Sequence, residues 1–215
     1  MMTAVKPAKT PYLKPAKTPA PKSAGRNSVR IIGGTWRGRR IQFPDLPGLR
    51  PTPDRVRETL FNWLQLTVAN ARCLDLFAGS GALGLEALSR GAREVVFVEQ
   101  AVAAAQCLRE QLTRLGGTAR AKVVEMGAKR YLGLPAEPFD LVFVDPPFGQ
   151  HALPTYLPLL AAGNWVVPGG LVYLECERAA SEPVLPPGWE LLKSKSAGEV
   201  GYHLARVVAR ALANA

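Results

Sequence analysis

Apolar residues in the second two thirds of the chain fall into short runs that alternate with helical patterns. The first five runs lie at 72–77, 94–99, 121–125, 139–144 and 170–175. Helical spacing occupies the stretches near 81–90, 101–115 and 152–162. Strands that are apolar almost throughout are typical of a parallel sheet with helices on both faces. Two further runs, 189–195 and 201–208, are joined by a short Ser- and Gly-containing segment and should pair antiparallel. We therefore predict an α/β domain over residues 71–210.

A smaller extension precedes this domain over residues 29–70. Two β-like runs within 29–43 surround several glycines and predict a hairpin with a loose turn. A helix should follow, with Thr52 as its N-cap, Pro53 at its first position and Asp54 complementing its dipole. Its predicted buried stripe consists of Val56, Leu60, Trp63 and Leu64, which recur at helical spacing.

The first 28 residues have a different composition. They are rich in Lys, Pro, Ala and Thr, and KPAKTP at 6–11 is repeated at 14–19. Proline disfavours helix and little apolar surface is available for burial, so we expect a disordered basic arm. The net charge of +10 is concentrated at this end, because residues 1–57 hold 13 of the 27 Lys and Arg and only two of the 17 acids. That asymmetry favours a polyanionic partner such as RNA, although a solubilising tail explains it as well.

Several classes of protein are disfavoured by what the sequence lacks. No run of about 18 apolar residues predicts a membrane span, and the N-terminus lacks the apolar region of a signal peptide. Three widely spaced cysteines and two histidines spell out no zinc site. We expect a cytoplasmic protein without a bound metal.

The second half of the hairpin combines basic residues with an aromatic one. Arg37, Arg39 and Arg40 surround Trp36. Guanidinium groups pair with phosphates, and an aromatic ring stacks on an unpaired base, so these four residues are candidates for RNA contact. For Trp36 the alternative is that its ring covers the apolar side of the hairpin.

A glycine-rich loop follows the first predicted strand of the domain. Gly79, Gly81 and Gly84 satisfy G-x-G-x-x-G directly after the strand that ends at Phe77, which indicates a nucleotide-like cofactor beside Phe77 and Ser80. Glu99 ends the second strand, where a carboxylate accepts ribose hydroxyls of either NAD or S-adenosylmethionine. Asp75 lies where a cationic amino-acid moiety would sit, which favours S-adenosylmethionine.

The fourth strand delivers Asp145, Pro146, Pro147 and Phe148 at its carboxyl end, where ligands bind in open α/β sheets. Asp145 and the carbonyl of Pro146 can each accept a hydrogen from one exocyclic amino group. Its nitrogen lone pair would then point toward the methyl group that is transferred, and such positioning supplies much of the rate. Phe148 would stack on the base.

The chain from about Arg30 to Arg206 resembles the RsmD-type methyltransferases of small-subunit ribosomal RNA. The resemblance is carried by RIIGGTWRGRRI (30–41), RPTPDRVRETLFNWL (50–64), LDLFAGSGALGLEALSRGA (74–92), Glu99 and FVDPPF (143–148). It implies the Rossmann-like class I methyltransferase fold, with a seven-stranded, mostly parallel sheet and an antiparallel terminal hairpin. It also implies a monomer that methylates guanine N2 in the 16S RNA of a ribosomal assembly intermediate. Thr52 would lie over the methionine end of the cofactor.

One position departs from that pattern. Such enzymes usually carry Asp or Asn after the third strand to hold the adenine amino group, whereas this chain has Gly127. The adenine is then held by backbone groups near Gly127 and Ala128, or the alignment shifts by two residues and Glu125 is the equivalent.

Three other functions compete with this interpretation. Asp-Pro-Pro-Phe also serves methylation of other amines such as adenine N6, although no room exists after Phe148 for the recognition domain of a DNA enzyme. The glycine loop alone is compatible with an NAD-dependent oxidoreductase. A non-catalytic RNA-binding assembly factor that keeps the fold is the third alternative.

Overall fold

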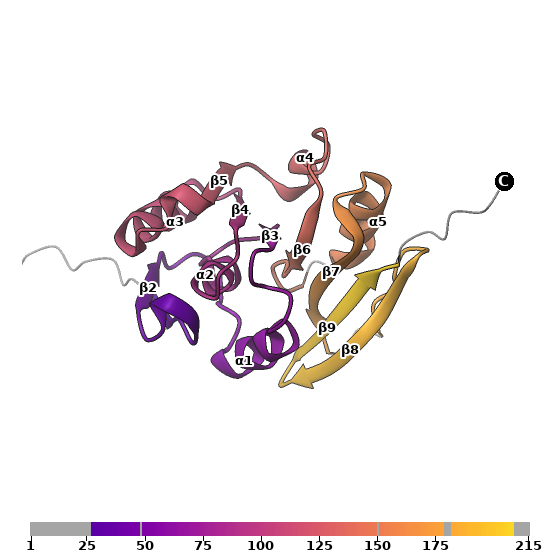
Figure 1. Ribbon diagram of the computed structural model, residues 1–215, viewed down its shortest axis with the longest axis horizontal. Coiled ribbons are helices and arrows are strands. Elements are labelled where there is room, and N and C mark those ends of the chain that lie inside the picture. The colour runs from indigo at the N-terminus through magenta and orange to yellow at the C-terminus, as the bar shows by residue number, and fades with distance from the viewer. Residues whose placement is uncertain (1–26, 48, 150, 179–181, 209–215) are drawn as a thin grey trace, which may run out of the picture.

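The computed structural model describes residues 27–47, 49–149, 151–178 and 182–208. Seven strands form one sheet in the order β5-β4-β3-β6-β7-β9-β8 (Figure 1). Their bounds are β3 Arg72–Asp75, β4 Glu94–Glu99, β5 Ala121–Glu125, β6 Phe139–Val144, β7 Val166–Glu177, β8 Trp189–Ala197 and β9 Val200–Val207. Strands β3 to β7 are parallel, and β9 runs antiparallel to both β7 and β8. The predicted sheet and its antiparallel terminal hairpin are confirmed.

Helices cover both faces of the sheet, because its central strands are apolar on both sides. Their bounds are α1 Asp54–Trp63, α2 Ala82–Ser89, α3 Val102–Leu115, α4 Ala128–Tyr131 and α5 Leu153–Ala162, with a 3-10 turn η2 at Thr118–Arg120. One core cluster joins α1, α2 and α3 to the sheet, and the other joins α4 and α5 to the opposite face. The sequence pattern did not predict the one-turn helix α4. No helix in the described part of the chain is long and apolar enough to cross a membrane.

The N-terminal hairpin consists of β1 (Asn27–Arg30) and β2 (Arg40–Phe43), joined through a 3-10 turn η1 at Gly34–Trp36. It lies beside α2 and α3 (Figure 1). Strand β1 begins two residues before the predicted extension. The rest of the predicted basic arm lies outside the described residues.

The predicted start of α1 is wrong. The helix begins at Asp54 with Pro53 as its N-cap, and no side chain caps it. The hydroxyl of Thr52 instead donates to Oδ2 of Asp145 at 2.9 Å. Because Thr52 does not cap the helix, its hydroxyl is available for a partner on the sheet. The segment before α1 therefore lies over the carboxyl ends of the strands.

Strand register decides which side chains meet at that edge. Asp75 on β3 pairs with Phe97 on β4 and with Phe143 on β6. Val144 on β6 pairs with Leu174 on β7, so the next residues, Asp145 and Glu175, are neighbours across two adjacent strands. Acidic residues thus gather at the carboxyl edge of the parallel sheet, where open α/β folds bind ligands.

Candidate active site

A cavity of about 500 Å³ opens over the carboxyl ends of β3, β4 and β6. This volume lies in the range of cofactor pockets. Among the predicted residues, those lining it are Thr52, Asp75, Phe77, Gly79, Ser80, Glu99, Gly127, Ala128, Asp145, Pro146 and Phe148. Gly81 is not in the lining. The structure therefore brings the predicted cofactor and catalytic residues to one cavity, apart from this glycine.

Gly81 acts on the shape of the loop. It is the N-cap of α2 with φ of 75°, a left-handed conformation that favours glycine. A Cβ atom there would lie 2.5 Å from the side chain of Leu108. At Gly84, a Cβ atom would lie 2.2 Å from the ring of Phe97. The glycines thus let α2 pack closely against β4 and leave the cavity open at the loop.

Two carboxyl groups in the cavity are held by backbone amides. Glu99 accepts the N–H of Gly79 through Oε2 and that of Ala101 through Oε1, both at 2.7 Å. Each carboxylate oxygen can accept a second bond, which suits a pair of ribose hydroxyls. Asp75 is 2% exposed, and its Oδ2 accepts the N–H of Gly84 at 3.0 Å.

Burial raises the pKa of Asp75 to about 7, and the charges of Asp145 and Glu99 act in the same direction, while the hydrogen bond from Gly84 opposes the shift. A cationic group bound next to these three acids relieves that repulsion. The donor set of the cavity therefore suits a ligand with hydroxyls at one end and a cation at the other. S-Adenosylmethionine, with its ribose and its cationic methionine portion, fits these residues.

The end of the cavity near α4 contains the position that departs from the expected pattern. Gly127 and Ala128 line the cavity together with Gln100 and Met126. Glu125 is not among the lining residues, and its carboxylate accepts from Nη1 of Arg109 at 3.0 Å. Gly127 and Ala128 therefore line the cavity and Glu125 does not, and the role of the two residues toward an adenine stays a prediction.

A second cavity of about 410 Å³ shares Asp145, Pro146, Pro147 and Phe148 with the first. Its other lining residues come from segments 151–154, 175–177 and 182–184. Phe148 is 50% exposed. The two prolines offer carbonyls and no amide donors. The Asp-Pro-Pro-Phe segment thus lies between the two cavities, and the Asp145 carboxyl is a hydrogen-bond acceptor that both cavities share.

Asp145 is half-buried between these cavities. It accepts the Thr52 hydroxyl, and burial raises the pKa of its carboxyl above the ordinary value. On the neighbouring strand, Glu175 is 3% exposed and its Oε1 accepts the hydroxyl of Tyr173 at 2.7 Å. Glu175 was not predicted from the sequence. Its signal was an acid at the end of an apolar strand, the same signal that singled out Asp75 and Glu99.

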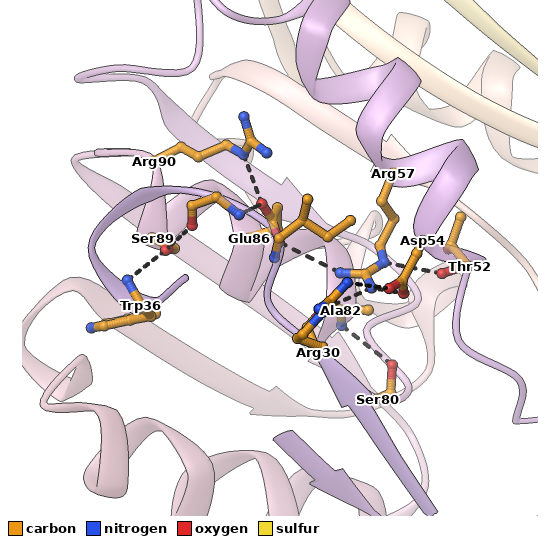
Figure 2. A network of polar contacts seen from close by, with 12 residues as sticks. Arg30, Trp36, Thr52, Asp54, Arg57, Ser80, Ala82, Glu86, Ser89 and Arg90 are labelled. Atoms are coloured by element: carbon orange, nitrogen blue, oxygen red, sulfur yellow. Dashed lines mark hydrogen bonds and ion pairs between the residues drawn. The ribbon is translucent and has the colours of Figure 1, made fainter. Parts of the chain in front are cut away.

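A buried ion network holds Thr52 from behind (Figure 2). Arg57 is 0% exposed and donates from Nε to the carbonyl of Thr52 at 3.0 Å. Its other nitrogens reach the carbonyl of Arg30, the carboxylate of Asp54 and the carboxylate of Glu86. Arg57 and Glu86 were not predicted from the sequence, because charged residues on an amphipathic helix are usually exposed.

The four predicted RNA-binding residues divide into two groups. Arg37, Arg39 and Arg40 are exposed. The prediction that Trp36 stacks on a base is wrong for this structure, because the residue is 6% exposed. Its ring lies against Gly117, where a Cβ atom would be 2.7 Å away, and the backbone N–H of Trp36 donates to Oγ of Ser89 at 2.9 Å. Trp36 therefore packs the hairpin onto the domain.

No group of three His, Cys, Asp or Glu residues in the described ranges is arranged to hold a metal ion. The carboxyl groups that line the first cavity, Asp75, Glu99 and Asp145, are hydrogen-bond acceptors that suit an organic ligand.

Comparison with known proteins agrees with this geometry. The model of the family described as conserved hypothetical protein 95 matches residues 29–206. Ribosomal RNA small subunit methyltransferase D of Escherichia coli K12 is 47% identical over 184 residues, 86% of this chain and 92% of that protein. The protein of the same name from Haemophilus influenzae is 43% identical over 83% of this chain and 94% of its own length. A solved structure titled putative methyltransferase yhhF from Escherichia coli has a TM-score of 0.80 at 46% identity and covers 86% of this chain and 100% of its own. The chain therefore belongs to the conserved hypothetical protein 95 family, the RsmD-type methyltransferases that its motifs resemble.

Proposed function

We propose that the protein transfers a methyl group from S-adenosylmethionine to the exocyclic N2 of a guanine in small-subunit ribosomal RNA. The observation that carries the proposal is that two cavities meet at Asp145 to Phe148. The first has the residues for the cofactor, and the second is open for a base. The names of the relatives, ribosomal RNA small subunit methyltransferase D, support the RNA substrate.

The bound cofactor supplies an electrophilic methyl group on a sulfonium. The residues of the chain position the two reactants and accept the proton that is released. In the proposed complex, Glu99 holds the ribose hydroxyls, Asp75 faces the cationic methionine portion, and Thr52 closes the cavity above Asp145. Such fixed orientation of two reactants accounts for much of the rate in this type of reaction.

In the second cavity, Asp145 and the Pro146 carbonyl each accept one hydrogen of the amino group. An amino group conjugated to a base is a weak nucleophile, and these acceptors direct its lone pair toward the first cavity. The amino nitrogen would gain the methyl group and a positive charge as the methyl–sulfur bond breaks, with the sulfonium leaving as the neutral thioether of S-adenosylhomocysteine. The Asp145 carboxylate would then accept the proton that the nitrogen loses. Phe148 is exposed at the rim and supports the ring of the base.

Acids in the second cavity favour guanine over adenine. Glu177 and Glu182 line it, and none of its described lining residues is Lys or Arg. Guanine carries an N1–H donor beside its amino group, whereas adenine carries a bare acceptor nitrogen there. A carboxylate accepts from the first and repels the second. The acidic wall therefore supports guanine N2 as the target atom.

The exposed arginines of the hairpin contact the phosphate backbone of the RNA in the proposed complex. Arg37, Arg39 and Arg40 project from the N-terminal extension, which also carries Thr52 into the active site. Phosphate contacts of this kind position a nucleic acid without reading its sequence. We propose that a monomer of the protein docks on the RNA through this side.

The test is methyl transfer from radiolabelled S-adenosylmethionine to small ribosomal subunits from a strain that lacks this gene, followed by nucleoside analysis. We expect the label in N2-methylguanosine. A label in N6-methyladenosine would make the protein an adenine methyltransferase. No label on any ribosomal RNA, with cofactor binding intact, would favour the non-catalytic assembly factor.

A further inference from the structure

Glu175 is a second buried acid at the reaction centre, and the proposed function as stated does not use it. It lies at the carboxyl end of β7, one residue beyond the pair Val144–Leu174 that joins β6 and β7. In a parallel pair, residues in register point to the same face of the sheet. The register therefore sets the Glu175 and Asp145 carboxyls beside each other, and both line the second cavity.

The groups facing Glu175 come from every element packed around it. Asp145 approaches from β6, and Thr52 from the segment before α1. Tyr173 lies on the same strand, and Tyr202 is the register partner of Glu175 on β9. None of these groups carries a positive charge. Two adjacent carboxyls without a cation cannot both remain ionised at low cost, so one of them retains a proton.

Burial decides which carboxyl holds that proton. Glu175 is 3% exposed, whereas Asp145 is half-buried and accepts the Thr52 hydroxyl at 2.9 Å. Burial, and next to it the charge of Asp145, raise the pKa of Glu175 well above its ordinary value. The Tyr173 hydroxyl donates to Oε1 of Glu175, which leaves the other oxygen for the proton. Asp145 is then the charged member of the pair.

We propose that Glu175 is a positioning residue that stays protonated and donates its proton in a hydrogen bond to Asp145. The chain of donors runs from Tyr173 to Glu175 to Asp145, with Thr52 donating to Asp145 from the other side. Asp145 is thereby held as a charged acceptor facing the amino group. The inference rests on the proposed function only for the identity of that amino group.

The substitutions Glu175→Gln and Glu175→Leu separate this role from simple packing. Glutamine reproduces a neutral acid, since its carbonyl accepts from Tyr173 and its NH₂ donates to Asp145. Leucine fills similar space without a donor. We expect Glu175→Leu to lower kcat by roughly 10-fold to 100-fold, the worth of a hydrogen bond to a charged group. Glu175→Gln should restore most of that loss, and KM should change little in either variant.

The pH profile gives a readout that packing alone would not move. Transfer requires ionised Asp145, so kcat falls as the pH drops through the pKa of that group. Loss of the Glu175 donor destabilises ionised Asp145 and raises its pKa, because this hydrogen bond lowers it in the intact protein. The acid limb of kcat should therefore move to higher pH in Glu175→Leu and stay in place in Glu175→Gln.

A measurement without substrate tests the proton directly. The infrared spectrum of the intact protein near pH 7 should contain a protonated-carboxyl band that Glu175→Gln removes. Absence of that band, or a Glu175→Gln variant as slow as Glu175→Leu, would overturn the proposal, because both results mean that Glu175 works as a carboxylate. A wild-type protein that methylates no RNA would instead contradict the proposed function, and the infrared band would still decide the state of Glu175.

Discussion

The carboxyl of Glu86 and the active-site carboxyls of Asp145 and Glu175 have opposite surroundings. Glu86 on α2 is 0% exposed and receives four donors. The amides of Ile32 and Gly33 lie at 2.8 Å, Nε of Arg90 at 2.7 Å and Nη1 of Arg57 at 3.5 Å. Figure 2 shows this carboxylate at the centre of contacts from the hairpin, α1 and α2.

The carboxyls at the active site receive fewer donors and face one another. Asp145 accepts from Thr52 and lies beside Glu175, and burial raises the pKa of both. Asp145 lines both cavities, and Glu175 lines the second. A carboxylate whose acceptor capacity is filled by the protein stabilises the fold, whereas one with capacity left toward a cavity can bind a ligand.

The two regions are nevertheless connected through one residue. Arg57 joins Glu86 to the carbonyl of Thr52, and the hydroxyl of Thr52 reaches Asp145. The N-terminal extension is therefore fixed by the filled carboxylate and presents one donor to the open one. A stable anchor behind the loop allows the half-buried Asp145 acceptor to keep its geometry.

The largest expected effect is on stability at the filled carboxylate. Glu86→Leu leaves Arg57 buried at 0% exposure without this partner and removes the acceptor of two backbone amides. We expect the free energy of unfolding to fall by about 3–5 kcal/mol, measured by urea denaturation. The matched control is Glu125→Leu, which removes the partially exposed pair with Arg109 and should cost less than about 1 kcal/mol. Equal losses in the two variants would mean that the buried Glu86 carboxylate stabilises the fold no more than the partially exposed Glu125–Arg109 pair does.

A smaller effect should appear in the pH dependence of stability through Asp75. Its pKa is about 7 in the folded protein against an ordinary value of 3.8, so the folded state binds more protons than the unfolded state between these values. Stability therefore rises as the pH falls from about 7 toward about 4, with a slope from this group of up to about 1.4 kcal/mol per pH unit. Asp75→Asn should reduce the slope of the profile of the ligand-free protein in that window, and the slope that remains comes from other acids with a raised pKa, such as Asp145. An unchanged profile would mean that Asp75 is ionised throughout.

The smallest effect concerns the exposed arginines of the hairpin. Neutralising Arg37, Arg39 and Arg40 should weaken RNA binding and reduce the slope of log affinity against log salt by roughly 0.7–0.9 for each phosphate that the protein no longer neutralises. Arg109→Ala, on α3 in a pair with Glu125, serves as the control and should leave the slope unchanged. A constant slope in the triple variant would show that the RNA docks elsewhere.

The sequence predicted the parts of the fold that depend on local pattern. Apolar runs located all strands of the main sheet, and the glycine loop and Asp-Pro-Pro-Phe marked its carboxyl edge. Thr52 was misread as an N-cap, because its partner Asp145 lies 93 residues further along the chain. Glu175 was missed for the same reason, since its proximity to Asp145 depends on the register between β6 and β7.

Trp36 and Arg57 show a second limit. The basic residues around Trp36 suggested an exposed ring, and an arginine on an amphipathic helix is ordinarily exposed. Both residues are buried because the hairpin and α1 close onto α2, where Ser89 and Glu86 supply the partners. Burial of a polar or amphipathic side chain depends on long-range packing that a local pattern does not encode.

The most direct test of the account is the paired measurement of methyl transfer and cofactor affinity in Asp145→Ala. The control is Asp140→Ala, at the exposed opposite end of the same strand, where the carboxylate accepts the N–H of Arg72. We predict that Asp145→Ala lowers the single-turnover rate by on the order of 10²–10³, as for the loss of one transition-state hydrogen bond. Affinity for S-adenosylhomocysteine should change little, and the control should retain its rate. Equal loss of transfer and cofactor binding, or transfer that continues undiminished, would contradict the assignment of Asp145 as the acceptor of the amino group.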